Sequence, residues 1–219
     1  MRVFDIILSF ITIVAFLPLG IFISLILKLT GEGEVFYLQE RIGLNSKSFF
    51  IIKFVTMVKD SPNIGAKDIT LKNDPRVLPI GRFLRKTKLN EFPQFINVLI
   101  GDMSLVGPRP LVINQFKSIP EKYRIKISIL RPGITSLGSI IFRDEEKFLN
   151  DIETNSNAFY KDEIVPYKSK IEYWYSKKKN IINDLKILFL TVLSIFSPKN
   201  KLHNWLFIGI PRHPIFNPK

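Results

Sequence analysis

The chain has 219 residues, enough for one ordinary domain with its own core. It is 46% hydrophobic and 23% charged, a balance that excludes both a disordered chain and a polytopic membrane protein. The net charge of +13 predicts attraction to polyanions, and the lack of cysteine excludes disulfides, thiolate metal sites and a Cys nucleophile.

The first element is an apolar segment. From Ile6 to Leu27 the chain carries no formal charge, and as a continuous helix this segment would reach about 33 Å, close to the thickness of the hydrocarbon layer. A signal peptide is the alternative, but its apolar region would be shorter and would end at small residues, whereas Lys28–Val35 offers a turn. The segment therefore predicts a membrane helix.

Pro18 bears on how this helix meets the membrane. It removes a backbone hydrogen bond and kinks the helix, and Gly20 eases the bend. Arg2 precedes the segment while Lys28 and a basic body follow it, so a spanning helix would leave positive charge on both sides. These features favour a re-entrant helix with Pro18 at the point of re-entry. A kinked spanning helix stays open, because transmembrane helices tolerate proline.

A hairpin is expected next. The apolar runs Val35–Leu38 and Phe49–Val58 flank a polar turn, and Lys53 is a lone cation on the second run. The stretch 60–79 is rich in Asp, Asn, Pro and Gly and predicts a long loop.

A helix is expected after the basic segment 81–88. Asn90 would be its N-cap, Glu91 would lie at the positive end of its dipole, and Pro93 would occupy the first turn, where a missing N–H is tolerated. Apolar residues recur at helical spacing at Phe92, Phe95, Ile96, Leu99 and Ile100.

The second half of the chain predicts two loops followed by amphipathic helices. The segments 101–110 (GDMSLVGPRP) and 131–135 (RPGIT) are shaped by Gly and Pro, and each presents an Arg. Helices are expected over 123–130, within 144–174, and over 184–196, which is too short to span a bilayer and is expected on the core or at the membrane interface.

Several cations occupy rigid or Gly/Pro-marked settings rather than solvated helical runs, and such cations suit phosphate binding. They are Lys53, Arg85, Arg109, Arg131 and Arg143. Nucleic-acid binding is the other interpretation of the basic charge. No nucleic-acid partner is predicted, because no known binding motif is present and the apolar segment would have no role.

The chain resembles the bacterial sugar transferase family, the monotopic polyprenyl-phosphate phosphoglycosyl transferases of the PglC and WcaJ type. The resemblance runs through almost the whole chain. Besides the apolar helix with Pro18, it rests on blocks at 39–57 (QERIGLNSKSFFIIKFVTM), 85–110 (RKTKLNEFPQFINVLIGDMSLVGPRP), 131–135 (RPGIT) and 174–191 (WY…DLKILFLT).

This resemblance implies an α/β, mostly helical protein at the cytoplasmic face of the bacterial inner membrane. Residues 1–30 would be the re-entrant helix, 31–199 a small catalytic α/β domain with amphipathic interface helices, and 200–219 an irregular tail. The implied reaction moves a sugar 1-phosphate from a UDP-sugar to undecaprenyl phosphate with Mg²⁺, releasing UMP and initiating surface glycan synthesis. Implied partners are both substrates and an anionic lipid bilayer, and a homo-oligomer stays open.

The resemblance also implies residue roles. The five cations would bind the donor's diphosphate, with Arg85 and Arg109 positioning it and neutralising its charge, and Glu91 would bind Mg²⁺. Well-known members carry an Asp-Glu dyad whose aspartate attacks the β-phosphate, whereas this chain has Asn90 before Glu91. A carboxamide is a poor nucleophile, so Asn90 cannot do that job.

Three mechanisms therefore stay open. Glu91 is the nucleophile, or Glu91 only binds Mg²⁺ while the lipid phosphate attacks directly, or the chain is an inactive relative that binds lipid or a partner. The acids Asp102, Asp144, Glu145 and Glu172 are further candidates that the sequence does not rank. A second departure, over 136–146, falls in a segment expected to help choose the sugar, so the donor's sugar stays open. An N-acetylated hexosamine or its diamino-trideoxy derivative is preferred, with galactose or glucose as the alternatives.

Overall fold

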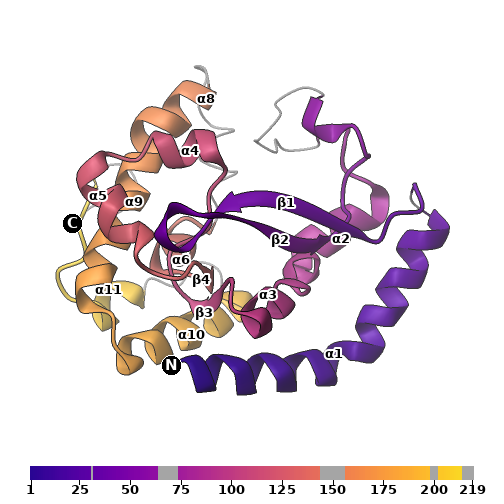
Figure 1. Ribbon diagram of the computed structural model, residues 1–219, viewed down its shortest axis with the longest axis horizontal. Helices are drawn as coiled ribbons and strands as arrows, with labels where there is room; N and C mark the ends of the chain where they lie inside the picture. The colour runs from indigo at the N-terminus through magenta and orange to yellow at the C-terminus, as the bar shows by residue number, and fades with distance from the viewer. Residues whose placement is uncertain (31, 64–73, 144–155, 198–201, 214–219) are drawn as a thin grey trace. The chain divides into compact units, whose positions relative to one another are not determined.

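The computed structural model describes residues 1–30, 32–63, 74–143, 156–197 and 202–213. Over these residues the protein is mostly helical with small sheets, as the sequence predicts (Figure 1). The chain divides into two compact units. The N-terminal unit comprises Arg2–Glu40 and Phe50–Gly101, and the C-terminal unit comprises Met1, Arg41–Phe49 and Asp102–Lys219.

The apolar segment forms one long helix, α1 (Arg2–Thr30), with Pro18 inside it. Figure 1 shows that α1 changes direction part-way along its length. Its most apolar stretch is only 11% buried by the rest of the protein, and by length and composition the helix is a candidate membrane span. The long apolar helix predicted for this segment is therefore present, and it is a candidate membrane span. Re-entry at Pro18 stays a prediction.

The predicted hairpin is confirmed, with a first strand that is longer and a second strand that is shorter than the predicted runs. Strands β1 (Phe36–Ile42) and β2 (Ser48–Phe54) form a two-stranded sheet, and the connection contains a short 3₁₀ turn, η1 (Leu44–Ser46). Asn97 is fully buried and bonds β2 through its side chain: its Nδ2 donates to Phe50 O at 2.7 Å, and its Oδ1 accepts from Ile52 N at 3.0 Å. This amide fixes the helix that carries Asn97 against β2.

The described part of the long loop contains a buried ion pair. Asp74 and Arg76 are paired at 2.6 Å, and Arg76 also donates to Ser61 O in the 3₁₀ turn η2 (Ser61–Asn63). Residues 64–73 lie outside the described part of the chain. Arg76 thus links residues 74–76, after the undescribed residues, to Ser61 before them.

The basic segment forms a helix of its own, α2 (Pro79–Thr87). The helix expected after it is divided into the 3₁₀ turn η3 (Leu89–Glu91) and α3 (Gln94–Ile100). The prediction of Asn90 as N-cap is wrong. Lys88 ends α2 in the left-handed conformation (φ 63°), Asn90 lies inside η3, and Pro93 holds the N-cap position of α3. Proline has no N–H to continue a helix, so α3 begins after it.

The two Gly/Pro segments predicted as loops contain strands. β3 (Ser104–Val106) pairs in parallel with β4 (Gly133–Thr135). Glycine is required where these segments meet. A Cβ on Gly107 would lie 2.2 Å from Arg131 O, and one on Gly133 would lie 2.1 Å from Gly107 N, so the two backbones touch where any side chain would separate them.

Helices surround this pair of strands in the C-terminal unit. The predicted helices over 123–130 and 184–196 and within 144–174 are confirmed where the chain is described, while residues 144–155 lie outside it. The tail expected to be irregular contains a short helix, α11. The helices are α4 (Ile113–Lys117), α5 (Glu121–Ser128), α6 (Leu137–Ile141), α8 (Ser156–Phe159), α9 (Val165–Lys178), α10 (Ile181–Phe196) and α11 (His203–Leu206), with a π-helical segment η4 (Tyr160–Ile164) before α9.

A buried polar network joins α9, α10 and β3. Lys179 Nζ donates to Asp184 Oδ2 at 3.1 Å and to Val106 O at 3.0 Å, and Tyr175 donates to the other Asp184 oxygen. Asp184 and Tyr175 are fully buried. The network fixes the two long helices to the strand that precedes the Gly107–Pro110 loop.

Candidate functional site

The dyad segment Asn90–Glu91 lies on η3, between α2 and α3 in the N-terminal unit. Asn90 is only 8% exposed, and its side-chain oxygen Oδ1 is buried without a hydrogen-bond partner among the described residues. Glu91 is half-buried. A buried acceptor without a partner is costly, so this oxygen is a candidate ligand for a donor or a cation.

Lys53 and Arg85 belong to the same unit as the dyad. Lys53, on β2, places its Nζ 3.5 Å from Gln39 Oε1, and Arg85 lies in the last turn of α2. Each is half-buried. The segments that carry these residues meet at one apolar cluster, because Phe54 follows Lys53, Leu84 precedes Arg85, and Leu89 and Phe92 bracket the dyad; all four apolar residues belong to that cluster. Each of the four predicted site residues of this unit therefore has a close neighbour in the sequence that packs in one apolar cluster.

Arg109 and Arg131 lie in the C-terminal unit on adjoining loops. Gly133 N donates to Pro108 O at 3.0 Å, and Gly107 touches the Arg131 backbone, so the two Arg-bearing loops are bonded side by side. Both arginines are exposed. Arg143, at the end of α6, donates to Ser194 Oγ on α10, a contact that anchors its side chain to that helix. Its role in phosphate binding stays a prediction.

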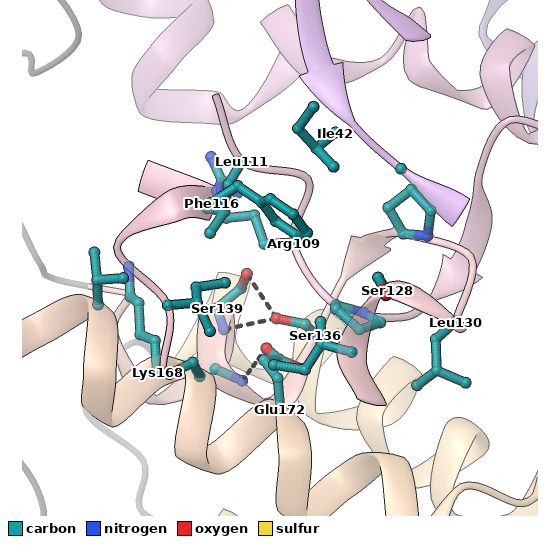
Figure 2. A pocket seen from close by; sticks show the side chains of 18 of the residues that line it. Ile42, Arg109, Leu111, Phe116, Ser128, Leu130, Ser136, Ser139, Lys168 and Glu172 are labelled. Carbon is teal, nitrogen blue, oxygen red and sulfur yellow. Dashed lines mark hydrogen bonds between the residues drawn. The ribbon is translucent and has the colours of Figure 1, made fainter. Parts of the chain in front are cut away.

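A pocket opens within the C-terminal unit (Figure 2). The lining is mostly apolar, with Arg109 and a few polar side chains interspersed. Its residues are Ile42, Gly43, Pro108, Arg109, Leu111, Phe116, Ile119, Ile127, Ser128, Leu130, Pro132, Ser136, Gly138, Ser139, Tyr160, Val165, Lys168, Ser169 and Glu172.

Glu172 is the buried acid of this pocket, at 6% exposure. Its Oε1 accepts from Gly138 N at 3.1 Å, and its Oε2 is buried with no hydrogen-bond partner in the described chain. Burial raises the pKa of Glu172 to about 7, while the Ser136 hydroxyl, the Gly138 N–H and the charges of Lys168 and Lys179 act to lower it. A perturbed carboxyl in a pocket marks a candidate functional residue.

Sequence reasoning named Glu172 only among acids that it did not rank. One signal was available: Val165, Lys168, Ser169 and Glu172 follow the i, i+3, i+4, i+7 spacing of one helix face, and all four line the pocket. Of the other three acids, Asp102 is half-buried before β3, and Asp144 and Glu145 lie outside the described residues.

No cluster of three or more His, Asp or Glu side chains able to hold a metal occurs in the described parts of the chain. Mg²⁺ commonly binds through one or two protein oxygens plus substrate phosphates. Asn90 Oδ1 and the Glu91 carboxylate are oxygen donors of the type that this ion prefers, so the residues present fit it.

The model of the family described as bacterial sugar transferase matches residues 1–198. The chain belongs to the bacterial sugar transferase family. Among the relatives of this chain, an uncharacterized sugar transferase of Haemophilus influenzae is 35% identical over 205 residues, covering 87% of this chain and 40% of the relative. The undecaprenyl-phosphate galactose phosphotransferase of Salmonella typhimurium is 34% identical over 205 residues, covering 87% of this chain and 39% of the relative.

Relatives differ in length and in the sugar that their names contain. The chain spans about two fifths of the length of the two relatives above. It spans 93% of the exopolysaccharide production protein PSS of Rhizobium leguminosarum, to which it is 32% identical over 199 residues, 88% of this chain. Relatives are named for glucose, galactose or N-acetylgalactosamine, and several are named for undecaprenyl phosphate.

Proposed function

We propose that this chain transfers a sugar 1-phosphate from a UDP-sugar to undecaprenyl phosphate, giving a polyprenyl diphosphate sugar and UMP, as the initiating membrane step of surface glycan synthesis. The observation that carries the proposal is the dyad segment. Asn90 presents a buried oxygen without a partner among the described residues, and it lies beside Glu91. Leu89 and Phe92, on either side of the dyad, pack against the apolar cluster that contains Phe54 and Leu84, the neighbours of Lys53 and Arg85 in the sequence. Relatives named for the same transfer support the assignment.

The transfer breaks the bond between the β-phosphorus and the oxygen that bridges it to the α-phosphate, and UMP leaves with that oxygen. A new bond joins the β-phosphorus to an oxygen of the lipid phosphate. Lys53, Arg85, Arg109 and Arg131 are proposed to neutralise substrate phosphates, for which the planar donors of Arg are suited. Arg143 is proposed for the same role, although its present contact is with Ser194.

Glu91 is the proposed essential carboxylate. Asn90 cannot attack phosphorus, so the attacking group is the Glu91 carboxylate or the lipid phosphate itself. The first route passes through a phosphosugar carried on Glu91 and predicts ping-pong kinetics, and the second predicts sequential kinetics. Mg²⁺ would be held by Glu91 and by Asn90 Oδ1, and when bound it would supply charge neutralisation for the diphosphate.

The membrane is the proposed location, at the cytoplasmic face of the bacterial inner membrane, with α1 entering and returning at Pro18. We propose that residues 1–30, 31–199 and 200–219 are the membrane helix, catalytic domain and tail.

The C-terminal unit has an apolar surface of its own, the α10 face, whose residues are each about half exposed. They are Ile182, Leu185, Phe189, Val192 and Ile195. Trp205 and Ile208 near α11 are more than four-fifths exposed. Exposed stripes of this kind suit an interfacial helix.

The test is UMP release by the detergent-purified chain, given undecaprenyl phosphate, Mg²⁺ and a panel of UDP-sugars. Release that needs the lipid and is lost in Glu91→Gln would support the proposal and the role of Glu91. Asp162→Asn, an exposed acid remote in sequence from the dyad, is the control and should retain activity. No release from any donor, with activity gained in Asn90→Asp, would identify an inactive relative whose function is binding.

A further inference from the structure

The helix α1 packs against the turn that carries the dyad. Phe92 directly follows Glu91, and its ring centroid lies 5.5 Å from that of Phe16. One turn further along α1, a Cβ added to Gly20 would lie 4.0 Å from Cε1 of Phe92. Phe16 and Gly20 stand two residues before and two residues after Pro18. The dyad turn therefore rests on the part of α1 that contains this proline.

The same helix also holds the far end of α3, which lies alongside it (Figure 1). The guanidinium of Arg2 donates to Val98 O and, at 2.8 Å, to Leu99 O. Both carbonyls belong to the last turn of α3, where carbonyls lack partners from the helix itself and where a cation is favourable. The segment from the dyad to the end of α3 is thus held by α1 at both of its ends.

The phenylalanines of α1 differ in their surroundings. Phe16 is 43% exposed, whereas Phe10 is 59% exposed and lies about 120° around the helix axis from Phe16. Both precede Pro18, and both are apolar side chains of one candidate membrane span. Removal of the Phe16 ring therefore differs from removal of the Phe10 ring chiefly in the contact with Phe92.

We infer that Phe16 is a positioning residue for the proposed transfer: its ring holds Phe92 in place and thereby fixes the position of the Glu91 carboxylate. The inference rests on the proposed function and gives α1 a part in turnover besides its proposed membrane attachment. Phe92 also contacts Phe95 of α3, with ring centroids 5.7 Å apart, so its ring has a neighbour on each helix. Without Phe16 the ring can move, and the backbone passes that movement to Glu91. A misplacement of about 1 Å can cost about a hundredfold in rate.

The test measures steady-state UMP release in vesicles that contain undecaprenyl phosphate, with Mg²⁺ and the UDP-sugar that supports turnover. Phe16→Ala should lower kcat about tenfold to a hundredfold and leave the KM for the UDP-sugar within about twofold, because substrate still binds while the reacting groups are misaligned. Phe16→Leu, which restores most of the missing volume, should recover most of the lost kcat.

Phe10→Ala is the matched control and should turn over like wild type. Flotation of each variant with the vesicles checks that membrane binding is unchanged. Equal kcat values for Phe16→Ala and Phe10→Ala would overturn the inference. A loss of kcat in Phe16→Ala that only follows a loss of folded protein, measured by thermal unfolding, would overturn it as well.

A double-mutant cycle tests whether the effect of Phe16 passes through Phe92. Phe92→Leu keeps an apolar side chain at this position and should lower kcat by itself. Combined with Phe16→Ala, it should lower kcat by clearly less than the product of the two single losses, because the effects of residues in contact are not additive. Combined with Phe10→Ala, the losses should multiply. Losses that multiply in the Phe16 pair as well would reject the contact as the route.

The outcomes also separate this inference from the transferase proposal. Lipid-dependent UMP release by wild type, with Phe16→Ala as active as Phe10→Ala, would leave the transferase standing and reject the positioning role. A wild-type protein that releases no UMP would reject both, because a positioning role requires the reaction.

Discussion

Glu172→Gln should stabilise the protein at alkaline pH, because burial makes the charged form of this carboxyl unfavourable. The pKa of Glu172 is about 7 in the folded chain against an ordinary 4.5. Between these values the folded state retains a proton that the unfolded state has lost. Stability therefore falls as pH rises through this window, and the cost is fully present above pH 7 and absent below pH 4.5.

The magnitude follows from the two pKa values. Each pKa unit corresponds to about 1.4 kcal/mol, so the ionised carboxylate costs the fold about 3 kcal/mol at pH 8. Glutamine has nearly the same shape and no charge, and it avoids this cost. For a chain of this length the difference corresponds to a rise in Tm of roughly 6 to 12 °C at pH 8.

The assay is thermal and urea unfolding of the detergent-solubilised protein at pH 5 and pH 8, for wild type, Glu172→Gln and the control Glu121→Gln. The two glutamine variants should differ strongly at pH 8, where only Glu172→Gln gains stability, and little at pH 5. Parallel pH profiles for wild type and Glu172→Gln would refute the reasoning. A functional group often lowers the stability of the fold and faces a pocket, and Glu172 is expected to do both.

Three further predictions concern the scaffold and the membrane surface. Asp184→Ala should cost about 3 to 5 kcal/mol in urea unfolding, because it leaves Lys179 and Tyr175 without their buried partner, whereas Asp162→Ala, which removes an exposed acid, should change little. Gly133→Ala should prevent the pairing of β3 with β4 and abolish cooperative unfolding. The control Gly20→Ala, whose added Cβ would lie 4.0 Å from its nearest atom, should be neutral or slightly stabilising. An unaffected Gly133→Ala protein would contradict the contact at Gly107. In a Trp174→Phe background the remaining Trp205 should be quenched by brominated phospholipids in vesicles, as its exposure beside the α10 face predicts, and quenching by aqueous iodide alone would place it in water.

Elements dictated by a local apolar pattern could be predicted from the sequence. The helix over Arg2–Thr30, the hairpin around Lys53 and the helix ending at Phe196 each carry an uninterrupted hydrophobic run or a clear periodicity. Their bounds shifted by only a few residues, because hydrogen bonding continues past the apolar residues until a breaker is reached.

Elements dictated by distant contacts could not be predicted. β3 and β4 are short, lie in segments rich in Gly and Pro, and pair only because Gly107 and Gly133 let two backbones touch across a long connection. Local propensity favours a loop in such segments. The prediction of Asn90 as N-cap placed Pro93 in the first turn of the same helix. In the structure Pro93 is itself the N-cap of α3, and Asn90 lies in the separate 3₁₀ turn η3.

The site was predicted unevenly. Lys53, Arg85 and the dyad are close in the sequence to apolar residues that share one core, and all four belong to one unit. The pocket could not be seen in the sequence, because Ile42, Arg109, Ser136 and Glu172 come from four separate segments. Only the spacing on α9 gave a hint of it, and that spacing is equally typical of a plain core face.

The most direct test of the central claim is to identify both products of one reaction. The chain in vesicles that contain undecaprenyl phosphate is given Mg²⁺ and a UDP-sugar that supports turnover, and the lipid and aqueous phases are analysed by mass spectrometry. The proposed function predicts one undecaprenyl diphosphate sugar for each UMP released. Release of UDP together with a lipid monophosphate sugar, or of UMP without any lipid-linked sugar, would contradict it.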